Sequence, residues 1–350
     1  MRILVLGGTR FVGRHLVEAA RAGGHAVTVF NRGRTPLPWD GLEQLAGDRE
    51  TGELESLRGR EWDACLDVNG YLPQQVRASA ALLRDRVARY AFISTASVYA
   101  LPGTPPIDET GDVHPVPAHE PDAVAPELYG PLKVACEQEV ERAFPGRALI
   151  LRPGIVAGPY DPTNRFAWWV ERVARGGEML GPGAPSSRVQ LVDGRDLAQF
   201  ATALIGAQAT GLFNVCGAPS TFGELLAACA SGTGSDARPT WVSEQLLLDA
   251  GVEPFNELPL WLPDEPDNRA FYSFSNARAR VAGLTLRPLS ETARDTWAWI
   301  AAVRAGASPA PTPGGFVARG LPREREAALL ADQRTRAGTC SGPSSSTRSS

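Results

Sequence analysis

The feature that most constrains the fold is the alternation of short apolar strands with helices over the first 155 residues. The strands are predicted at 2–6, 26–30, 62–68, 90–95 and 147–152, and the helices at 11–23, 73–88 and 126–143. These strands are continuously apolar rather than alternately apolar and polar, so they are buried on both faces. The sequence therefore predicts an α/β fold with a doubly wound parallel sheet.

A glycine-rich loop joins the first predicted strand to the first predicted helix. Its residues are Gly7, Gly8, Thr9, Arg10, Phe11, Val12 and Gly13. Glycine permits a tight turn and a close backbone approach, and a helix N-terminus offers free N–H groups and partial positive charge to a pyrophosphate. The position after a strand and before a helix favours a dinucleotide site over a plain turn.

The end of the second predicted strand bears on the choice of cofactor. An acid at position 31 would bind ribose hydroxyls and repel a 2′-phosphate, whereas the chain has Asn31. Arg32 and Arg10 are placed to meet a phosphate. We therefore expect NADP, with NAD as the alternative. Asp48 is a candidate acceptor for the adenine amino group, and a plain turn residue is its alternative role.

The domain organisation follows from where this pattern weakens. We expect a Rossmann domain over 1–158 and a smaller C-terminal substrate lobe over 159–305, with some segments returning to the first domain. Helices are predicted in that lobe at 166–175, 195–206, 222–231 and 289–303. Residues 306–335 are predicted to form a linker followed by a C-terminal helix at 321–335. Residues 336–350 are predicted to be a disordered tail.

Composition excludes several classes of protein. The chain has 35 Lys+Arg against 39 Asp+Glu, and its net charge of −4 argues against nucleic-acid or anionic membrane partners. No apolar run approaches the roughly 18–20 residues of a membrane span. The first seven residues make a poor signal peptide, so we expect a cytoplasmic protein. The five cysteines and four histidines do not cluster, which predicts neither disulfides nor a metal site.

Lys133 is the only lysine, while the other 34 basic residues are arginine. It follows Tyr129 by one helical turn, so the two side chains share a helix face. A nearby ammonium stabilises a phenolate and lowers the tyrosine pKa from about 10. It is also suited to hold a nicotinamide ribose. The alternative is an exposed lysine beside a packed tyrosine.

A hydroxyl cluster follows the strand predicted at 90–95. In a doubly wound sheet the carboxyl ends of the strands line the ligand crevice. We choose Thr95 as the group that binds a substrate carbonyl, with Ser94 and Ser97 as rivals. The alternative is a set of hydroxyls that cap backbone groups.

These motifs together resemble the extended, partly atypical short-chain dehydrogenases/reductases of the NAD-dependent epimerase/dehydratase type, over about residues 1–300. The resemblance implies catalytic Thr95, Tyr129 and Lys133. It implies a cofactor resting on the glycine loop, position 31, Asp48, the Val68-Asn69-Gly70 loop and Pro153-Gly154-Ile155, with Tyr129 and Lys133 also in contact. It also implies a C-terminal lobe that closes over the substrate.

Several positions depart from the family pattern. Arg10 replaces the middle glycine, as in atypical members, and Ala96-Ser97 replace the acidic pair that dehydratases carry. Epimerases of sugar nucleotides have an asparagine where this chain has Ile155, and their diphosphate-binding arginine falls near Val189.

Three functional hypotheses remain open. The first is a reductase or dehydrogenase acting on a small-molecule substrate, and the second is an epimerase of a sugar or sugar nucleotide. The third is an RNA-binding protein, because the glycine loop also resembles chloroplast stem-loop-binding members of the atypical group. Family members often dimerise, which leaves a homodimer open. The aromatic residues of the second lobe form either its core or an apolar pocket: Trp168, Trp169, Trp261, Phe271, Tyr272 and Phe274.

Overall fold

The computed structural model describes residues 1–34, 37–101, 104–311 and 315–339. Its contacts divide the chain into two compact units. Unit 1 comprises Met1–Asp161, Gln190–Pro219 and Glu265–Pro288, and unit 2 comprises Pro162–Val189, Ser220–Asp264 and Leu289–Ser350. No helix among the described residues is long and apolar enough to cross a membrane.

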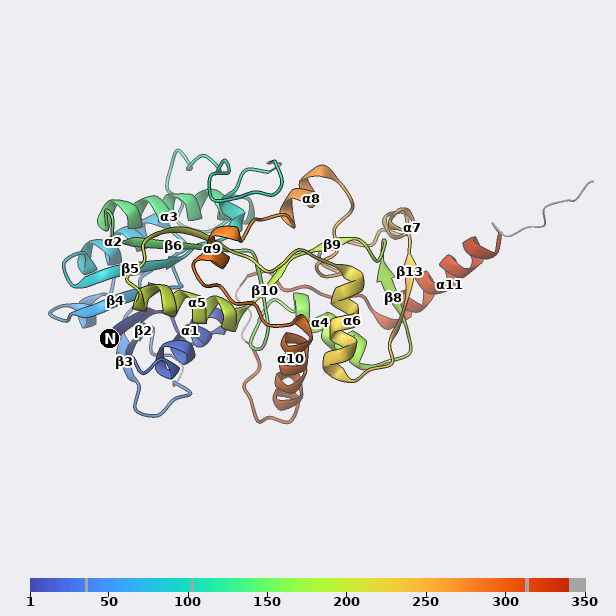
Figure 1. Cartoon of the computed structure of the whole chain (residues 1–350), viewed down its shortest axis with the longest axis horizontal. Coiled ribbons are helices and arrows are strands. Elements are labelled where there is room, and N and C mark those ends of the chain that lie inside the picture. The colour runs from blue at the N-terminus through green and yellow to red at the C-terminus, as the bar shows by residue number, and fades with distance from the viewer. Residues whose placement is uncertain (35–36, 102–103, 312–314, 340–350) are drawn as a thin grey trace, which may run out of the picture. The chain divides into compact units, whose positions relative to one another are not determined.

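A seven-stranded parallel sheet forms the centre of unit 1 (Figure 1). Its strands are β1 (Arg2–Leu6), β2 (Ala26–Asn31), β3 (Glu43–Ala46), β4 (Trp62–Asp67), β5 (Val87–Ile93), β6 (Ala148–Pro153) and β11 (Gly211–Val215). Their order is β11-β6-β5-β4-β1-β2-β3, so the direction of winding reverses between β1 and β4. The predicted doubly wound fold is confirmed. Ligands bind such sheets at this reversal, outside the carboxyl ends of the strands.

Helices cover both faces of this sheet. α1 (Phe11–Ala22) packs against α5 (Gly194–Gly206), and α2 (Pro73–Leu83) packs against α3 (Tyr129–Ala143) (Figure 1). The smaller elements of unit 1 are η1 (Glu55–Leu57), η2 (Ala96–Val98), η3 (Pro126–Leu128), β7 (Ile155–Ala157), β10 (Leu191–Asp193), α8 (Pro266–Phe271) and α9 (Ala277–Val281). β7 and β10 pair in parallel.

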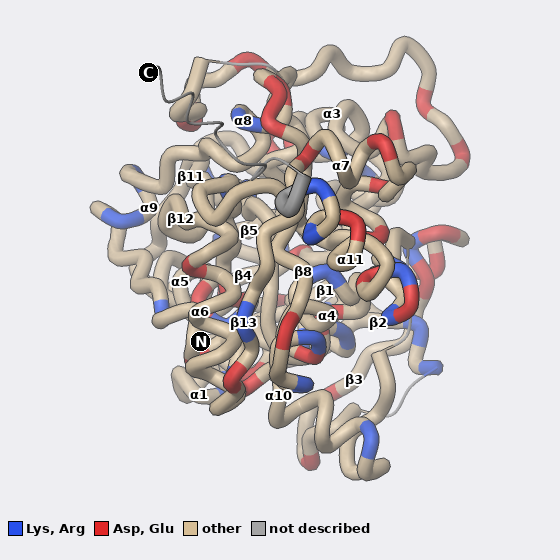
Figure 2. Tube along the Cα trace, turned by 90° about the vertical axis from the view of Figure 1, so that its right-hand side faces the viewer, with Lys and Arg blue, Asp and Glu red and all other residues tan. Residues whose placement is uncertain are grey.

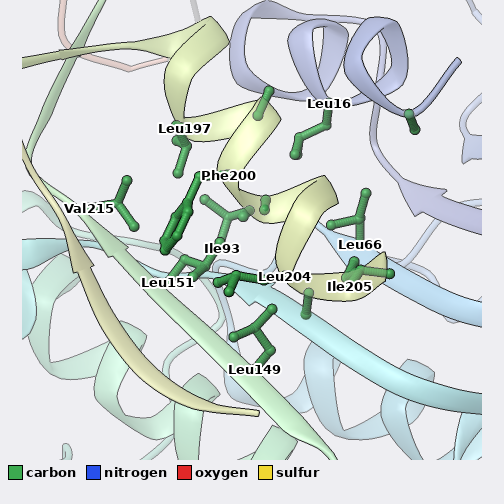
Figure 3. Close-up of a cluster of buried hydrophobic side chains, with 14 of the residues drawn as sticks. Leu16, Leu66, Ile93, Leu149, Leu151, Leu197, Phe200, Leu204, Ile205 and Val215 are labelled. Carbon is green, nitrogen blue, oxygen red and sulfur yellow. The ribbon is translucent and has the colours of Figure 1, made fainter. Parts of the chain in front are cut away.

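The core of unit 1 lies on both faces of the sheet because successive strand residues point to opposite sides. On β5, Ile93 joins the cluster beneath α1 and α5, whereas Phe92 joins the cluster beneath α2 and α3. Figure 3 shows Leu197, Phe200 and Leu204 of α5 directed at the aliphatic side chains of the strands. All of these side chains are buried.

Two strands of the sheet were not predicted. β3 is a four-residue edge strand without a β-branched residue, and β11 follows the point where the sequence pattern weakens. The helix predicted at 73–88 was too long. It ends at Leu83 because β5 already begins at Val87, and Arg86 accepts a hydrogen bond from the backbone N–H of Trp62.

Unit 2 is built from helices and short strands. Its elements are α4 (Arg165–Ala174), β8 (Glu178–Pro182), β9 (Arg188–Val189), β12 (Ser220–Thr221), α6 (Phe222–Thr233), β13 (Arg238–Val242), α7 (Glu244–Asp249), α10 (Leu289–Arg304) and α11 (Arg323–Thr339). β8 pairs with β13, and α6 packs against both α4 and α10. A capping box of Thr221 and Glu224 begins α6.

The C-terminal helix is docked within unit 2. Glu326 of α11 accepts hydrogen bonds from the buried guanidinium of Arg172 and from the backbone N–H of Leu180. The helix continues to Thr339, past the predicted end at 335, so the part of the predicted tail at 336–339 is helical. The rest of that tail, 340–350, and residues 312–314 of the predicted linker lie outside the described residues.

Most of the aromatic residues predicted for the second lobe are core residues. Trp169 and Trp261 are fully buried in unit 2, and Trp169 contacts Phe222 edge to face. Tyr272 and Phe274 are also buried, but they belong to unit 1, as does Phe271.

A glycine sets the position at which α3 begins. A Cβ atom on Gly130 would lie 2.2 Å from the backbone oxygen of Ser97, in η2. Only a residue without a side chain permits this approach. The contact therefore holds the first turn of α3 against the loop that follows β5.

We expect Gly130→Ala to move the start of α3 away from η2 and to lower the stability of the protein by about 1–3 kcal/mol, the usual cost of overpacking. Urea unfolding measures this change. The matched control is Gly206→Ala at the end of α5, where a Cβ meets nothing within 4 Å. Equal stabilities of the two variants would show that the Gly130 contact is unimportant.

Candidate functional site

The glycine loop forms a tight cradle at the carboxyl end of β1. Gly7 and Gly8 have φ values of 108° and 91°, which favour glycine. A Cβ on Gly13 would lie 2.7 Å from the backbone nitrogen of Gly8. The side chain of Arg10, the N-cap residue of α1, makes no capping hydrogen bond. The first N–H groups of α1 thus have no cap from this side chain, an arrangement typical of helix N-termini that bind anions.

The last residue of β2 is Asn31, and only one atom of its side-chain amide is hydrogen-bonded within the protein. Asn31 Oδ1 accepts hydrogen bonds from the backbone N–H of Gly33 and from Gln44, both at 2.8 Å. Because the Gly33 N–H can only donate, the amide orientation is determined, and Nδ2 is the atom left over. This buried Nδ2 has no hydrogen-bond partner. Arg32 and Arg10 are exposed beside the strand and loop ends.

Asp48 lies in the turn that follows β3. Its Oδ1 accepts the backbone N–H of Glu50 at 3.0 Å, and its backbone pairs with Glu53. The structure thus shows the turn role, and the adenine contact stays a prediction.

The loop after β4 packs beneath the glycine cradle. Val68 Cγ1 lies 2.8 Å from where a Cβ of Gly7 would be, so the two loops are in close contact. A Cβ on Gly70 would lie 2.6 Å from both Phe92 and Val76. Asn69, which lies between Val68 and Gly70 in the chain, is exposed.

The predicted residues at the end of β6 lie on the same edge of the sheet. Pro153 is the last residue of β6, and Ile155 is the first residue of β7. Both are buried. Parallel strands bring their carboxyl ends together, so Pro153 and Ile155 share an edge with the glycine loop.

Lys133 is buried, with 2% of its surface exposed. Its Nζ donates hydrogen bonds to the carbonyl oxygens of Gly70 and Ile93, each at 2.9 Å. It also lies 4.0 Å from the ring centroid of Phe92 and 5.8 Å from that of Tyr71. An ammonium has three donors, so one remains beyond these two carbonyls. Lys133 is therefore not the exposed lysine of the alternative interpretation.

Burial lowers the pKa of Lys133 to about 8, because the charged form is desolvated. Nearby Asp67 and Glu137 act in the opposite direction and favour the ammonium. The lysine is thus mostly protonated at neutral pH and loses its charge as the pH rises through about 8.

The hydroxyl of Thr95 caps a short helix. Its Oγ1 accepts the backbone N–H of Ser97 and donates to Ser97 Oγ, both at 3.1 Å. Thr95 is 9% exposed, whereas Ser97 is exposed. The buried Oγ of Ser94 has no hydrogen-bond partner. All three residues follow β5, which ends at Ile93 rather than at the predicted residue 95.

Tyr129 is the first residue of α3 and is half-buried. It precedes Gly130, whose contact with Ser97 brings this turn of α3 to the loop that carries Thr95. Helical spacing places Tyr129 and Lys133 on one face. The loop after β5 and helix α3 thus carry the three predicted catalytic residues, and the loop after β4 supplies an acceptor for Lys133.

Sequence reasoning assigned no role to two buried ion pairs next to Lys133. Arg49 binds Asp67, and Arg152 binds Glu137, each through two hydrogen bonds. Asp67 ends β4 and directly precedes the Val68-Asn69-Gly70 loop, and Arg49 follows Asp48, so both are neighbours of predicted cofactor-binding residues. The described residues contain no group of three or more His, Cys, Asp or Glu side chains that could hold a metal ion.

Comparison with known proteins identifies the family of this chain. The sequence model of a protein family, described as the NAD dependent epimerase/dehydratase family, matches residues 3–68 and 63–216 of this chain. A chloroplast stem-loop binding protein of 41 kDa from Arabidopsis thaliana is 28% identical over 254 residues, which are 67% of this chain and 63% of that protein. A UDP-glucose 4-epimerase from Azospirillum brasilense is 29% identical over 189 residues, 47% of this chain and 51% of that protein.

The chain thus spans about half to two thirds of the length of these curated relatives. The structure of the Bordetella bronchiseptica enzyme WbmH in complex with NAD+ has the same fold, with a TM-score of 0.65 and 16% identity. The structural match covers 88% of this chain and 99% of the WbmH chain. The family match extends over more than half of the sequence, and we conclude that the chain belongs to the NAD dependent epimerase/dehydratase family.

Proposed function

We propose that this chain is an NADP-dependent reductase or dehydrogenase that transfers hydride to or from a carbon of a small-molecule substrate. Its catalytic residues are Thr95, Tyr129 and Lys133. One observation carries the proposal. The only lysine of the chain, Lys133, is buried one helical turn from Tyr129, and it donates hydrogen bonds to the carbonyls of Gly70, after β4, and Ile93, at the end of β5.

The loops at this edge fit a dinucleotide. The uncapped start of α1 suits a pyrophosphate, and the tight turn that precedes it needs glycine, because a Cβ at Gly7 would meet Val68 and a Cβ at Gly13 would meet the backbone of Gly8. When bound, the dinucleotide supplies the hydride donor or acceptor. The third donor of Lys133 is suited to a ribose hydroxyl.

The three side chains divide the proton chemistry. Tyr129 donates a proton to the substrate oxygen during reduction and removes it during oxidation. The Lys133 ammonium favours the ionised phenol. Thr95 donates a hydrogen bond to the same oxygen, in place of its bond to Ser97 Oγ. Ala96 and Ser97 supply no acid–base pair, which argues against dehydration.

Asn31 supports NADP rather than NAD. Its unpartnered Nδ2 is a donor, and a 2′-phosphate offers only acceptors at neutral pH. Exposed Arg10 and Arg32 add positive charge near the cradle and the end of β2.

The proposal is tested first by mass spectrometry of nucleotide released from the denatured, freshly purified protein, followed by titration with NADPH and NADH. We expect an empty protein that binds NADPH reversibly. Stoichiometric retained NAD would instead support an epimerase, which oxidises and re-reduces its own substrate. Binding of neither nucleotide would contradict both enzyme hypotheses.

We expect Tyr129→Phe to reduce carbonyl-dependent NADPH oxidation at least about 100-fold, the usual contribution of a general acid, with NADPH affinity nearly unchanged. Stopped assays with a panel of carbonyl compounds measure the rate, and fluorescence titration measures the affinity. Tyr160→Phe makes the same change at a tyrosine whose ring packs against Arg14 and His15 of α1, and it should retain wild-type activity. Substantial turnover by Tyr129→Phe would exclude the proposed acid.

We expect Asn31→Asp to weaken NADPH binding about tenfold or more, because a carboxylate repels a 2′-phosphate, while NADH binding is retained or improved. Gln138→Glu adds the same charge on the exposed side of α3 and controls for net charge. If both cofactors respond equally to Asn31→Asp, this residue does not face the 2′ position.

A second candidate function is stem-loop binding, which the name of the Arabidopsis relative states for that protein. The net charge of −4 and the intermixed basic and acidic residues along α11 (Figure 2) do not favour a polyanion. Binding of a stem-loop RNA at physiological salt, with no binding of nicotinamide cofactor, would make it the first candidate.

A further inference from the structure

A buried ion pair lies behind the proposed reaction site. Arg49 Nη1 and Nη2 donate to the two carboxylate oxygens of Asp67 at 2.7 and 3.0 Å. Tyr90 Oη donates to the same carboxylate at 2.7 Å. The Asp67 side chain is fully buried, and that of Arg49 is 5% exposed. Burying two charges is costly unless the geometry and the remaining hydrogen bonds compensate.

The pair is joined to Lys133 through the loop after β4. The backbone N–H of Asn69 donates to Asp67 Oδ1 at 3.1 Å. The carbonyl of the next residue, Gly70, accepts the 2.9 Å hydrogen bond from Lys133 Nζ. A single turn of chain thus connects the carboxylate to the atom that binds the lysine.

The arginine is itself held from α2. Its Nη2 donates to Ser79 Oγ at 2.9 Å and to the carbonyl oxygen of Gln75 at 3.4 Å. The loop after β3, the end of β4, β5 and α2 therefore meet at this pair.

We propose that Asp67 and Arg49 are positioning residues for Lys133. Asp67 holds the Gly70 carbonyl against the lysine through the backbone N–H of Asn69 and places a buried carboxylate near the ammonium, while Arg49 and Tyr90 hold that carboxylate in position. This inference rests on the proposed function of Lys133, and it assigns roles to residues that touch neither substrate nor cofactor.

The groups that face Lys133 identify Asp67 as the principal charge. They are Cys136 and Glu137 of its own helix, Asp67 of β4, Arg49, and Tyr71 of the loop after β4, whose phenol pKa is raised by burial. Burial raises the pKa of the Cys136 thiol to about 12, so this group is uncharged where Lys133 titrates. Glu137 accepts hydrogen bonds from Nε and Nη2 of Arg152. Asp67 has a larger effect on Lys133 than Arg49 has, and the two act in opposite directions.

The single lysine makes the test direct. Protein grown with lysine labelled with carbon-13 at Cε gives one lysine side-chain signal, whose shift follows the protonation of Lys133. We expect a titration midpoint of about 8 in the full-length wild-type protein.

The two substitutions should move this midpoint in opposite directions. Asp67→Asn removes the favourable charge and lowers it by about one pH unit or more, whereas Arg49→Gln raises it. Each single variant leaves one buried charge unpaired and is expected to be less stable. The double variant leaves the interior neutral and should lower the midpoint, because the effect of Asp67 is the larger one.

The matched control is Asp193→Asn. Asp193 is also a buried aspartate that accepts hydrogen bonds from an arginine, Arg195, but it is not among the groups with the largest effects on the pKa of Lys133. We expect this variant to lose stability without moving the midpoint. Equal shifts in Asp67→Asn and Asp193→Asn, or a midpoint that moves in neither Asp67→Asn nor the double variant, would overturn the proposal.

Cofactor binding is measured separately, by NADPH titration of the same variants. We expect Asp67→Asn to bind NADPH several-fold more weakly above pH 7, where its lysine has lost charge. If Asp67→Asn and Arg49→Gln shift the Lys133 titration midpoint in opposite directions but the wild-type protein binds no nucleotide, the positioning role is supported and the proposed function is refuted.

Discussion

The buried ammonium of Lys133 is the interaction on which the candidate site depends. A charge removed from water is tolerated only when hydrogen bonds and nearby charges replace its hydration. Here the carbonyls after β4 and at the end of β5 provide that replacement. The same two bonds draw α3 onto the sheet edge, so the lysine determines where Tyr129 lies as well as its own environment. The lowered pKa of Lys133 is the remaining cost of burial.

The sheet provides the edge on which this interaction is built. Its order reverses between β1 and β4, and the loops that follow these two strands are the glycine cradle and the Val68–Gly70 loop. Both loops are closely packed, because a Cβ at Gly7 or Gly70 would meet a neighbouring side chain and a Cβ at Gly13 would meet the backbone of Gly8. No side chain of the N-cap residue bonds to the first N–H groups of α1.

Two buried ion pairs surround Lys133, and both join elements distant in sequence. Arg49 and Asp67 link the loop after β3 to the end of β4, while Arg152 and Glu137 link β6 to α3. Buried pairs contribute little net stability compared with apolar residues of similar volume. Their presence at this edge agrees with a role in specifying the positions and charges of neighbouring groups.

The sequence by itself determined the strand–helix alternation, the glycine loop and the one-turn spacing of Tyr129 and Lys133, because these depend on local period and on residues close in the chain. It did not indicate β3 or β11, short strands that exist only through pairing with neighbours. Nor did it indicate that Asp67 faces Arg49, and it left open whether Thr95 caps a backbone group, as it does in η2. Only the tertiary structure decided these contacts, because no periodicity of the sequence relates residues that meet across a sheet. The strength with which one charged side chain acts on another also depends on how deeply the fold buries both.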